Sequence, residues 1–314
     1  MIAFTAEKIE QNQRKNWLIN RKKLESIRYN KLSKRAKRTG ETHLIDRLYP
    51  AASVFLKSVN LYNRGIKNAL SMQINRQDLT FSQLPAAFNG YKILHLTDLH
   101  LDALPGIEEV ICEKIAALEY DLCVLTGDYR KLTIGSFEEI VAPLEKIINC
   151  THAKDGVVAI LGNHDTHEIV PFLEEMGVTV LTNETMYIER EVEKIMITGV
   201  DDPHYYYSGQ AVEALRTPDE SFKMALIHSP ELYEEAAANG YHLYLCGHTH
   251  AGQICLPQGI PILRNLKKGH HLFRGLWQHD RLTGYTSSGC GVSGLPLRFF
   301  TRGEIALFTL RREA

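Results

Sequence analysis

The chain of 314 residues lacks any apolar run of the roughly 20 residues that a membrane-spanning helix needs. Its N-terminus also lacks the short basic segment and following apolar segment that mark a secretory signal. The six cysteines form no C-x-x-C pair, and without an export signal they indicate a cytoplasmic protein with reduced, mostly buried thiols. These cysteines are Cys112, Cys123, Cys150, Cys246, Cys255 and Cys290.

A strong net charge is absent as well, because 36 Lys and Arg stand against 37 Asp and Glu, a formal net charge of -1. This average hides two regions of opposite charge. Residues 1–76 hold 17 basic and 5 acidic side chains, a balance of +12, whereas residues 77–314 hold 19 and 32, a balance of -13. Since 44% of the residues are hydrophobic and 23% charged, the composition is that of a folded globular protein rather than a disordered one.

We predict a basic, helical N-terminal extension over residues 1–80 and a second domain over residues 81–314. Residues 45–70 carry apolar side chains at steps of three and four, which is typical of one face of a helix. They are Ile45, Leu48, Ala52, Phe55, Val59, Tyr62, Ile66 and Ala69. Pro50 fits only near a helix start or at a break, and Gly65 weakens the prediction of one unbroken helix.

From Tyr91 onward, short apolar runs alternate with stretches of helical spacing. This alternation is typical of an α/β domain built around largely parallel strands. The predicted strands cover residues 91–97, 121–126, 156–161, 195–200, 223–228, 242–246, 281–288 and 304–311. The predicted helices cover residues 106–119, 136–149, 167–176 and 230–239.

Polar side chains that are able to bind a metal follow five of these strands, at the point where each strand ends. They are Asp98 and His100 after the first strand, Asp128 after the second, Asn163 after the third, His228 after the fifth, and His248 and His250 after the sixth. In open α/β sheets the carboxyl ends of the strands form one edge, where several loops converge on a site. Glycines beside these residues allow the backbone to turn sharply and to approach a bound ion.

Seven oxygen and nitrogen ligands without cysteine match borderline to hard divalent ions such as Mn, Fe or Zn. They are too many for one catalytic ion that keeps an open position. Two ions about 3.5–4 Å apart, which share a bridging carboxylate and activate a bridging water, account for all of them. A single D-x-H or H-x-H motif is more often structural than functional, but motifs at five strand ends together indicate a binuclear centre.

In order, the motifs D-x-H, G-D, G-N-H-[DE], a lone His and G-H-x-H resemble those of the calcineurin-like metallophosphoesterase superfamily over residues 91–311. The resemblance implies a four-layer αββα sandwich, in which two mixed β-sheets pack face to face with helices outside. It implies ligands for two divalent metal ions, with Mn expected and Fe or Zn as alternatives: Asp98, His100 and His250 for the first, Asp128 as the bridge, and Asn163, His228 and His248 for the second. It also implies that His164 contacts the substrate phosphate and protonates the leaving oxygen, while Asp165 orients this imidazole.

Two further observations narrow the expected substrate. Residues 127–130 (Gly-Asp-Tyr-Arg) lack the G-D-x-x-D-R-G signature of the protein phosphatases in this superfamily, which argues against phosphoprotein substrates. Residues 199–203, 247–254 and 293–299 resemble a bacterial branch that contains membrane-associated phosphodiesterases and a pyrophosphatase that cleaves UDP-2,3-diacylglucosamine.

We therefore predict a metal-dependent hydrolase of phosphodiester or pyrophosphate bonds that uses a metal-bridging hydroxide. The expected substrate is lipid-linked or nucleotide-linked, such as UDP-2,3-diacylglucosamine. The alternatives are a soluble nucleotide or cyclic-nucleotide phosphodiesterase, a nuclease, and a binding scaffold without activity. A scaffold has no need for seven ligands, so the complete ligand set argues against the last of these.

The basic extension allows three interpretations. In the first, its Ile45, Phe55 and Val59 face packs on the second domain. In the second, residues 1–76 anchor the protein peripherally at the cytoplasmic face of an anionic membrane. In the third, the extension binds nucleic acid, but the lack of a recognised module and the few interleaved aromatic residues argue against this.

Three residue groups near the expected site have both a functional and a structural interpretation. Tyr205–Tyr207 either line a substrate cleft or pack within a loop. His270 and His271 either recognise an acyl chain or a sugar, or lie in a surface loop. Arg298 pairs either with a phosphate or with a structural carboxylate. None of these groups is predicted to be catalytic.

Overall fold

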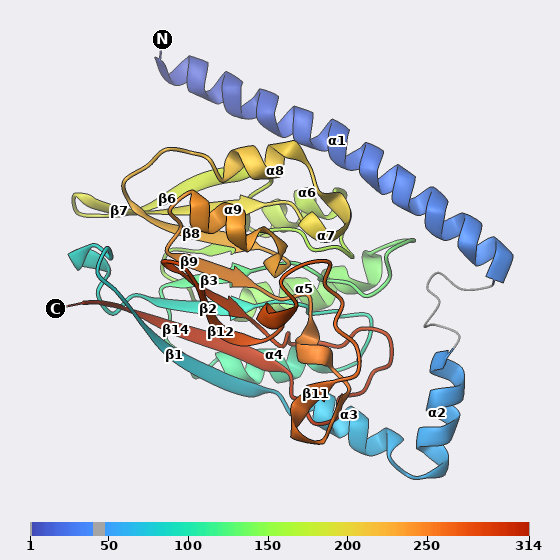
Figure 1. The fold of residues 1–314 in the computed structure, drawn as a ribbon. Helices are drawn as coiled ribbons and strands as arrows, with labels where there is room; N and C mark the ends of the chain where they lie inside the picture. The colour runs from blue at the N-terminus through green and yellow to red at the C-terminus, as the bar shows by residue number, and fades with distance from the viewer. Residues whose placement is uncertain (1, 40–47, 314) are drawn as a thin grey trace.

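Two six-stranded mixed sheets form the centre of the protein in a computed structural model that describes residues 2–39 and 48–313 (Figure 1). The first sheet has the strand order β1-β14-β2-β3-β4-β5, and the second has the order β12-β13-β9-β8-β7-β6. The sheets pack face to face and carry helices on their outer faces. This arrangement confirms the predicted αββα fold class.

The elements have the following bounds. The strands of the first sheet are β1 (Gln73–Phe81), β14 (Glu304–Arg312), β2 (Lys92–Leu96), β3 (Leu122–Leu125), β4 (Val157–Ala159) and β5 (Thr179–Val180). Those of the second are β12 (Gly275–His279), β13 (Leu282–Thr286), β9 (Leu243–Cys246), β8 (Phe222–Ile227), β7 (Glu193–Val200) and β6 (Glu184–Arg190), and a small hairpin consists of β10 (Cys255–Leu256) and β11 (Ile260–Pro261). The α-helices are α1 (Ile2–Thr39), α2 (Leu48–Ser58), α3 (Tyr62–Leu70), α4 (Ile107–Ile115), α5 (Glu138–Cys150), α6 (Ile169–Glu175), α7 (Pro203–Tyr206), α8 (Gly209–Ala214) and α9 (Tyr233–Ala238).

The central strands are apolar on both faces because both faces are covered. In β2, Ile93 faces the layer between the sheets and packs in one cluster with Ile197 of the second sheet. Its neighbour Leu94 points the other way and packs in the cluster that includes Ile111 of α4 and Leu144 of α5. Strands covered on both faces are expected to consist of nearly continuous hydrophobic runs, which is the pattern that made them recognisable in the sequence.

All eight predicted strands correspond to strands of the two sheets, and the four predicted helices correspond to α4, α5, α6 and α9. The unpredicted strands of these sheets are β1, β5, β6 and β12, which occupy the four edges. An edge strand has one open side and is often short or polar, so its sequence carries a weaker signal. The division between an extension and a domain at residue 80 stays a prediction, and β1 runs across it in parallel pairing with β14.

The apolar pattern of residues 45–70 forms two helices rather than one. α2 places Pro50 in its first turn, where no helical hydrogen bond is lost, and the chain turns at Asn60, whose φ is 57°. Gly65 lies inside α3 against the second domain. A Cβ atom there would lie 2.9 Å from the side chain of Leu297 and 3.0 Å from that of Phe299, so only glycine permits this packing.

The interpretation that the Phe55 and Val59 face packs on the second domain is wrong. Their side chains are 63% and 45% exposed, and no residue of α2 is buried. Ile45, which belongs to the same predicted face, lies outside the described residues. The helical extension packs through α1 instead, which crosses one end of the sandwich near α7 and α8 (Figure 1). Trp17 is buried and its Nε1 donates to Oδ2 of Asp201 over 2.9 Å.

The expectation that all six cysteines are reduced thiols is also wrong. Cys112 of α4 and Cys150 at the end of α5 form a disulfide, with their Cα atoms 5.6 Å apart. The other four cysteines are free and buried. The two partners are 38 residues apart and meet only because α4 and α5 pack together, so no local spacing signalled the pair. The cysteine pattern therefore no longer favours a reducing compartment.

Within the described residues, none of the helices combines the length and the apolar composition that are required to cross a membrane.

The buried imidazole of His95 makes the stability of the fold depend on pH. Its Nε2 lies 2.8 Å from Oγ1 of Thr126, and burial lowers its pKa from 6.5 to about 3. Between these pH values the unfolded chain binds one more proton than the folded chain at this site, so the free energy of unfolding rises with pH. The shift corresponds to a stabilisation on the order of 4 kcal/mol that is present above pH 6.5 and is lost as the pH falls toward 3.

We therefore expect His95→Gln, which keeps a partner for Thr126 but does not titrate, to flatten the pH dependence of stability. Urea unfolding of both proteins at a series of pH values from neutral to acidic measures this directly. The slope of unfolding free energy against pH below 6.5 should be smaller for the variant than for the unmodified chain. Parallel curves for the two proteins would contradict the assignment to His95.

Candidate metal centre

The seven residues expected to bind metal converge where the carboxyl ends of strands from both sheets meet. They are Asp98 and His100 after β2, Asp128 after β3, Asn163 after β4, His228 after β8, and His248 and His250 after β9. All seven are buried. Five of them have a positive φ in the left-handed region, namely Asp98, His100, Asp128, His248 and His250. Such strained backbone persists where the surrounding structure over-determines it, and it is concentrated at functional sites.

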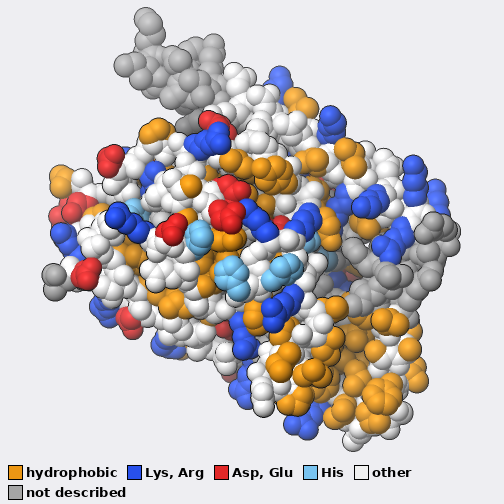
Figure 2. All heavy atoms as spheres, viewed as in Figure 1, with side chains coloured by type: hydrophobic (Ala, Val, Ile, Leu, Met, Phe, Trp, Pro, Cys, Tyr) orange, Lys and Arg blue, Asp and Glu red, His pale blue; other side chains and the backbone are white. Residues whose placement is uncertain are grey.

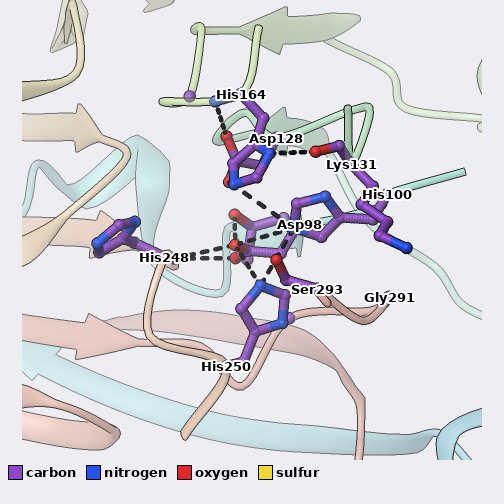
Figure 3. A network of polar contacts seen from close by, with 12 residues as sticks. Asp98, His100, Asp128, Lys131, His164, His248, His250, Gly291 and Ser293 are labelled. Carbon is purple, nitrogen blue, oxygen red and sulfur yellow. Dashed lines mark hydrogen bonds and ion pairs between the residues drawn. The ribbon is translucent and has the colours of Figure 1, made fainter. Parts of the chain in front are cut away.

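One group of ligand atoms consists of Asp98, His100 and His250, whose candidate donor atoms all lie within 4.8 Å of one another. Nε2 of His250 lies 3.3 Å from Oδ1 of Asp98, and Nε2 of His100 lies 4.0 Å from the same oxygen. The two Nε2 atoms are 3.1 Å apart. Figure 3 shows both imidazoles pointing toward the Asp98 carboxylate.

A second group consists of Asp128, His228 and His248, again within 4.8 Å of one another. Oδ1 of Asn163 lies among them, 3.1 Å from Nε2 of His228 and 2.6 Å from Nδ1 of His248. Asp128 connects the two groups, since its Oδ2 lies 3.2 Å from Nε2 of His228 and 3.7 Å from Nε2 of His100. The described structure therefore contains candidate ligand groups for two metal ions with one carboxylate between them.

Hydrogen bonds on the far side of the rings determine which nitrogen of each imidazole faces the site. Nδ1 of His100 lies 2.9 Å from the carbonyl oxygen of Arg130, and Nδ1 of His228 lies 2.7 Å from that of Thr126. Nε2 of His248 lies 2.7 Å from the carbonyl oxygen of Asn265. A carbonyl oxygen only accepts, so these ring nitrogens carry the protons and donate.

Burial lowers the pKa of His228, but the Asp128 carboxylate outweighs burial and holds this pKa well above its usual value, so in the protein alone Nε2 of His228 donates to Asp128. The nitrogens of neutral His100 and His248 that face the site are bare lone pairs. They point at one another and at carboxylate or amide oxygens across the distances given above. Acceptors at such separations repel unless a cation lies between them, so the residues fit divalent metal ions well. Nδ1 of His250, on the outer side of its ring, is buried and has no hydrogen-bond partner among the described residues.

The charges of the site favour an anionic bridge. Burial raises the pKa of Asp128, but the nearby imidazoles of His228 and His164 outweigh burial and hold the pKa of this carboxyl well below its usual range. Burial lowers the pKa of His164 to about 3, although the Asp128 carboxylate opposes this effect. In the protein alone Asp128 is therefore ionised at neutral pH and His164 is neutral.

Two glycines are required by the close approach of strand ends to the carboxylates. A Cβ atom at Gly162 would lie 2.2 Å from Oδ1 of Asp128, and one at Gly247 would lie 2.1 Å from Oδ2 of Asp98. Either contact would displace the carboxylate, so the glycines in the predicted motifs serve the geometry of the site.

His164 and Asp165 lie in the loop after β4 but differ in position. The imidazole of His164 is partly exposed, and its Nε2 lies 3.9 Å from Oδ2 of Asp128 (Figure 3). Its Nδ1 faces the carbonyl oxygen of Lys131 rather than a carboxylate. The expected orienting role of Asp165 is therefore not observed.

Asp165 holds the backbone of the site instead. Its Oδ2 accepts from the backbone N–H groups of Asp128 and Gly162, both at 2.7 Å, and its Oδ1 accepts from that of Tyr129 at 3.0 Å. These three hydrogen bonds fix the two strand ends relative to each other. The sequence motif G-N-H-D placed the residue correctly, but its direction is set by tertiary contacts.

Helix α1 contributes side chains that the sequence interpretation missed. Arg21 is completely buried; it forms an ion pair with Asp201, donates to the carbonyl oxygen of Asp165 over 2.7 Å, and stacks 3.5 Å over the ring of Tyr206. Arg28 donates through Nη1 to the carbonyl oxygen of Asn163. Both arginines thus hold the loop that carries Asn163 and His164. The only signal in the sequence was the high density of Lys and Arg, which does not distinguish these two from the exposed ones.

The three ambiguous residue groups also have defined places. Tyr206 packs under Arg21, and Tyr205 lies beneath Arg28, so these tyrosines support the contact with α1. Arg298 is fully buried and donates to backbone carbonyls that include those of Ser288 and His250. His270 and His271 lie in a short 3-10 helix (His270–Leu272) outside the two ligand groups.

The sequence of this chain is similar to those of known phosphoesterases. The family model for calcineurin-like phosphoesterase matches residues 91–252. The metallophosphoesterase YkuE of Bacillus subtilis is 31% identical over 240 residues, which cover 73% of this chain and 82% of YkuE. The phosphodiesterase YaeI of Escherichia coli is 30% identical over 253 residues, 76% of this chain and 88% of YaeI. Among solved structures, the calcineurin-like phosphoesterase YfkN from Bacillus subtilis has a TM-score of 0.40 and 13% identity, over 64% of this chain and 81% of that chain.

Proposed function

The chain belongs to the calcineurin-like phosphoesterase family of metal-dependent phosphoesterases, and we propose that it hydrolyses phosphodiester or pyrophosphate bonds. The observation that supports the proposal most directly is the convergence of imidazole, carboxylate and amide ligand atoms in two groups that share Asp128. A partly exposed imidazole, that of His164, lies beside the shared carboxylate. A centre for two ions with an acid next to it suits attack on phosphorus and departure of an alcohol or phosphate.

Two divalent ions bound there would neutralise the phosphate and activate a water for attack on phosphorus. We propose Mn as the native metal, with Fe and Zn as alternatives, because the ligands are carboxylate, amide and imidazole without thiolate. The chain itself keeps the site organised. Backbone carbonyls fix the ring orientations of His100, His228 and His248, and the ionised Asp128 supplies a negative charge to both groups.

His164 has the geometry of a general acid. Its Nδ1 faces a backbone carbonyl, so Nε2 is the atom that faces the site and exchanges a proton there. Burial favours the neutral ring, but a phosphate anion that binds beside it adds negative charge and raises the pKa of the imidazole again. The substrate thus promotes protonation of the residue that then donates a proton to the leaving oxygen.

We propose that Arg28 of α1 binds a non-bridging phosphate oxygen. Its guanidinium stacks 3.6 Å over the ring of Tyr205, and Nη1 is used by the carbonyl of Asn163. Its Nη2 is buried and has no hydrogen-bond partner in the described part of the chain. Arg28 and Arg130 both line a cleft of about 280 Å³ between α1 and the loops that follow β3 and β4. A planar donor that is already oriented on one side loses little entropy when it binds a phosphate on the other.

We expect Arg28→Met to raise KM for a phosphodiester by about 10- to 100-fold while kcat falls much less, because a charge-assisted hydrogen bond to bound substrate is lost. Arg28→Lys should lose less affinity than Arg28→Met, because lysine keeps the positive charge but lacks the planar pair of N–H donors of the guanidinium. Steady-state kinetics with measured metal content provides the test. Lys31→Met, an exposed position on the same helix, is the matched control. Equal effects of Arg28→Met and Lys31→Met would contradict the role of Arg28.

For the substrate we propose a lipid-linked or nucleotide-linked phosphate such as UDP-2,3-diacylglucosamine. Support comes from the segments that resemble the lipid-handling branch, and two of them lie at the site. Residues 247–254 carry His248 and His250. Residues 199–203 include Asp201, whose carboxylate forms an ion pair with Arg21 and accepts a hydrogen bond from Trp17 of α1. A soluble nucleotide or cyclic-nucleotide phosphodiesterase is the second candidate, and the name of YaeI supports diester cleavage in either case.

The proposal is tested with the full-length chain loaded with Mn. Hydrolysis of bis-p-nitrophenyl phosphate is compared with that of p-nitrophenyl phosphate, and UDP-2,3-diacylglucosamine with cyclic nucleotides. We expect the diester to be cleaved faster than the monoester, and the lipid-linked pyrophosphate faster than the cyclic nucleotides. Preference for cyclic nucleotides would favour the second candidate. No turnover by a protein that holds two ions per chain, whether Mn, Fe or Zn, would overturn catalysis and favour a scaffold.

A further inference from the structure

The amphipathic helix α2 keeps its apolar side chains on the surface. Leu48, Val54, Phe55 and Val59 are 64%, 68%, 63% and 45% exposed. Isolated exposed apolar side chains are ordinary, but three on one short helix and a fourth directly after it make this part of the surface strongly apolar. Figure 2 shows a large hydrophobic area on the part of the molecule where α2 and α3 lie in Figure 1.

The β10–β11 hairpin and the residues after it add a second exposed apolar group. Leu256, Ile260, Ile262 and Leu263 are each more than half exposed. Half of the hairpin's side chains thus point away from the core. We call this group together with Leu48, Val54 and Phe55 of α2 and the following Val59 the apolar rim.

The two halves of the apolar rim are connected through α3 and the segment 297–299. Gly65 of α3 packs against Leu297 and Phe299, and the backbone N–H of Cys255 donates to the carbonyl oxygen of Phe299 over 2.9 Å. Ile254, just before the hairpin, forms a bridge with Phe299. The α2–α3 pair and the hairpin are therefore held on the same side of the molecule, as Figure 1 also shows for α3 and β11.

The charge around the apolar rim has one sign. Residues 47–77 contain five Lys and Arg and no Asp or Glu, and residues 251–279 contain four Lys and Arg and again no Asp or Glu. Exposed basic side chains flank both halves: Lys57, Arg64 and Lys67 on α2 and α3, and Arg264 and Lys267 after the hairpin. An apolar surface bordered by basic residues is the arrangement that binds the headgroup region of an anionic bilayer.

The apolar rim continues directly into the metal centre. Two residues after Leu263, the carbonyl oxygen of Asn265 accepts the hydrogen bond from Nε2 of His248. On the other side, Nη1 of Arg298 donates to the carbonyl oxygen of His250 over 3.2 Å. The loop that carries Leu263 outward therefore holds His248, and the segment 297–299 that connects the two halves of the apolar rim holds His250.

We propose that the apolar rim docks on an anionic lipid bilayer and presents the metal centre to phosphate groups at the bilayer surface. A second copy of the chain is the less suitable occupant, because a two-fold interface would bring one basic border against the other. The orientation toward a lipid-linked phosphate rests on the proposed function, whereas the docking itself is measured separately. The surface overlaps the one expected from the sequence, residues 1–76, through α2. It adds the hairpin and leaves out α1, because α1 packs on the loops that carry Asn163 and Asp165.

The test uses the full-length, Mn-loaded chain and vesicle sedimentation. Vesicles of phosphatidylcholine with phosphatidylglycerol are compared with pure phosphatidylcholine vesicles at low and high salt. We expect binding to the anionic vesicles that weakens with salt. Val54→Ser/Phe55→Ser on α2 and Ile260→Ser/Ile262→Ser on the hairpin should each lower the affinity by at least about tenfold. Val192→Ser, at a side chain that is 98% exposed between β6 and β7, is the matched control and should bind normally.

The outcomes separate the two proposals. Hydrolysis of bis-p-nitrophenyl phosphate, which needs no membrane, should be the same for Val54→Ser/Phe55→Ser as for the unmodified chain. Vesicle binding that depends on the rim, without any hydrolysis, would overturn the proposed function and leave the docking surface intact. The docking surface would be overturned if the protein hydrolyses the diester but does not bind vesicles, or if the rim variants bind vesicles as tightly as the unmodified chain. It would also be overturned if sedimentation shows that the chain is a dimer and that the rim variants, but not Val192→Ser, are monomers.

Discussion

Replacement of Asp128 by alanine is expected to lower kcat/KM for a phosphodiester by at least about a thousandfold and to remove most of the bound metal. The reason is the shared position of its Oδ2, which is 3.2 Å from Nε2 of His228 and 3.7 Å from Nε2 of His100. Both ligand groups therefore lose the same anion at once. A variant of a ligand that belongs to one group only, such as His250→Ala, should retain more metal than Asp128→Ala.

A second variant separates the charge of Asp128 from its structural contact. Oδ1 of this carboxylate accepts from the backbone N–H of His164 over 2.7 Å, which ties two strand-end loops together. Asp128→Asn keeps an oxygen for that bond and should preserve thermal stability, but it removes the charge and should still lose activity.

Elemental analysis and steady-state kinetics of the three proteins provide the measurement. Asp78→Ala, which removes an exposed carboxylate on β1 that pairs with Arg311, serves as the control. We expect this control to keep two ions per chain and normal rates. Two ions retained by Asp128→Ala, with a rate within tenfold of the unmodified chain, would contradict the bridging role.

Replacement of His164 by alanine is expected to leave the metal content unchanged and to lower kcat by about a hundredfold to ten-thousandfold, which is the usual contribution of a general acid. The imidazole lies 3.9 Å from Oδ2 of Asp128, and its Nδ1 faces the carbonyl oxygen of Lys131, so neither ligand group depends on it. Equal loss of metal and activity in this variant would contradict the assigned role.

Substrates with different leaving groups distinguish a general acid from a structural residue. An acid matters most when the departing oxygen is a strong base, so the loss in His164→Ala should be large for an alkyl leaving group and small for p-nitrophenolate. Asp165→Asn is the informative companion variant. Because its carboxylate accepts from three backbone N–H groups, we expect it to lower stability and the rates with all leaving groups alike. If the rate loss in Asp165→Asn depends on the leaving group as it does in His164→Ala, Asp165 acts through His164, as the sequence predicted.

The candidate metal-binding residues were recognisable in the sequence because their position is a local property. Asp98 and Asp128 directly follow apolar strands, and parallel strands of one sheet end at the same edge whatever the rest of the chain does. The central strands were recognisable for a similar reason, since burial on both faces makes them continuously apolar. The four edge strands lack that burial on one side, and none of them was predicted.

Contacts between distant parts of the chain were decided only in the folded protein. The carbonyl of Asp165 that receives Arg21 is 144 residues away in sequence, and Cys112 meets Cys150 only through the packing of two helices. The basic composition of residues 1–76 set this region apart from the rest of the chain, but it could not separate α1 from α2. Hydrophobic periodicity reports that a helix has two faces, whereas which face finds a partner depends on the shape of the rest of the molecule. That is why Trp17 is buried and Phe55 is exposed.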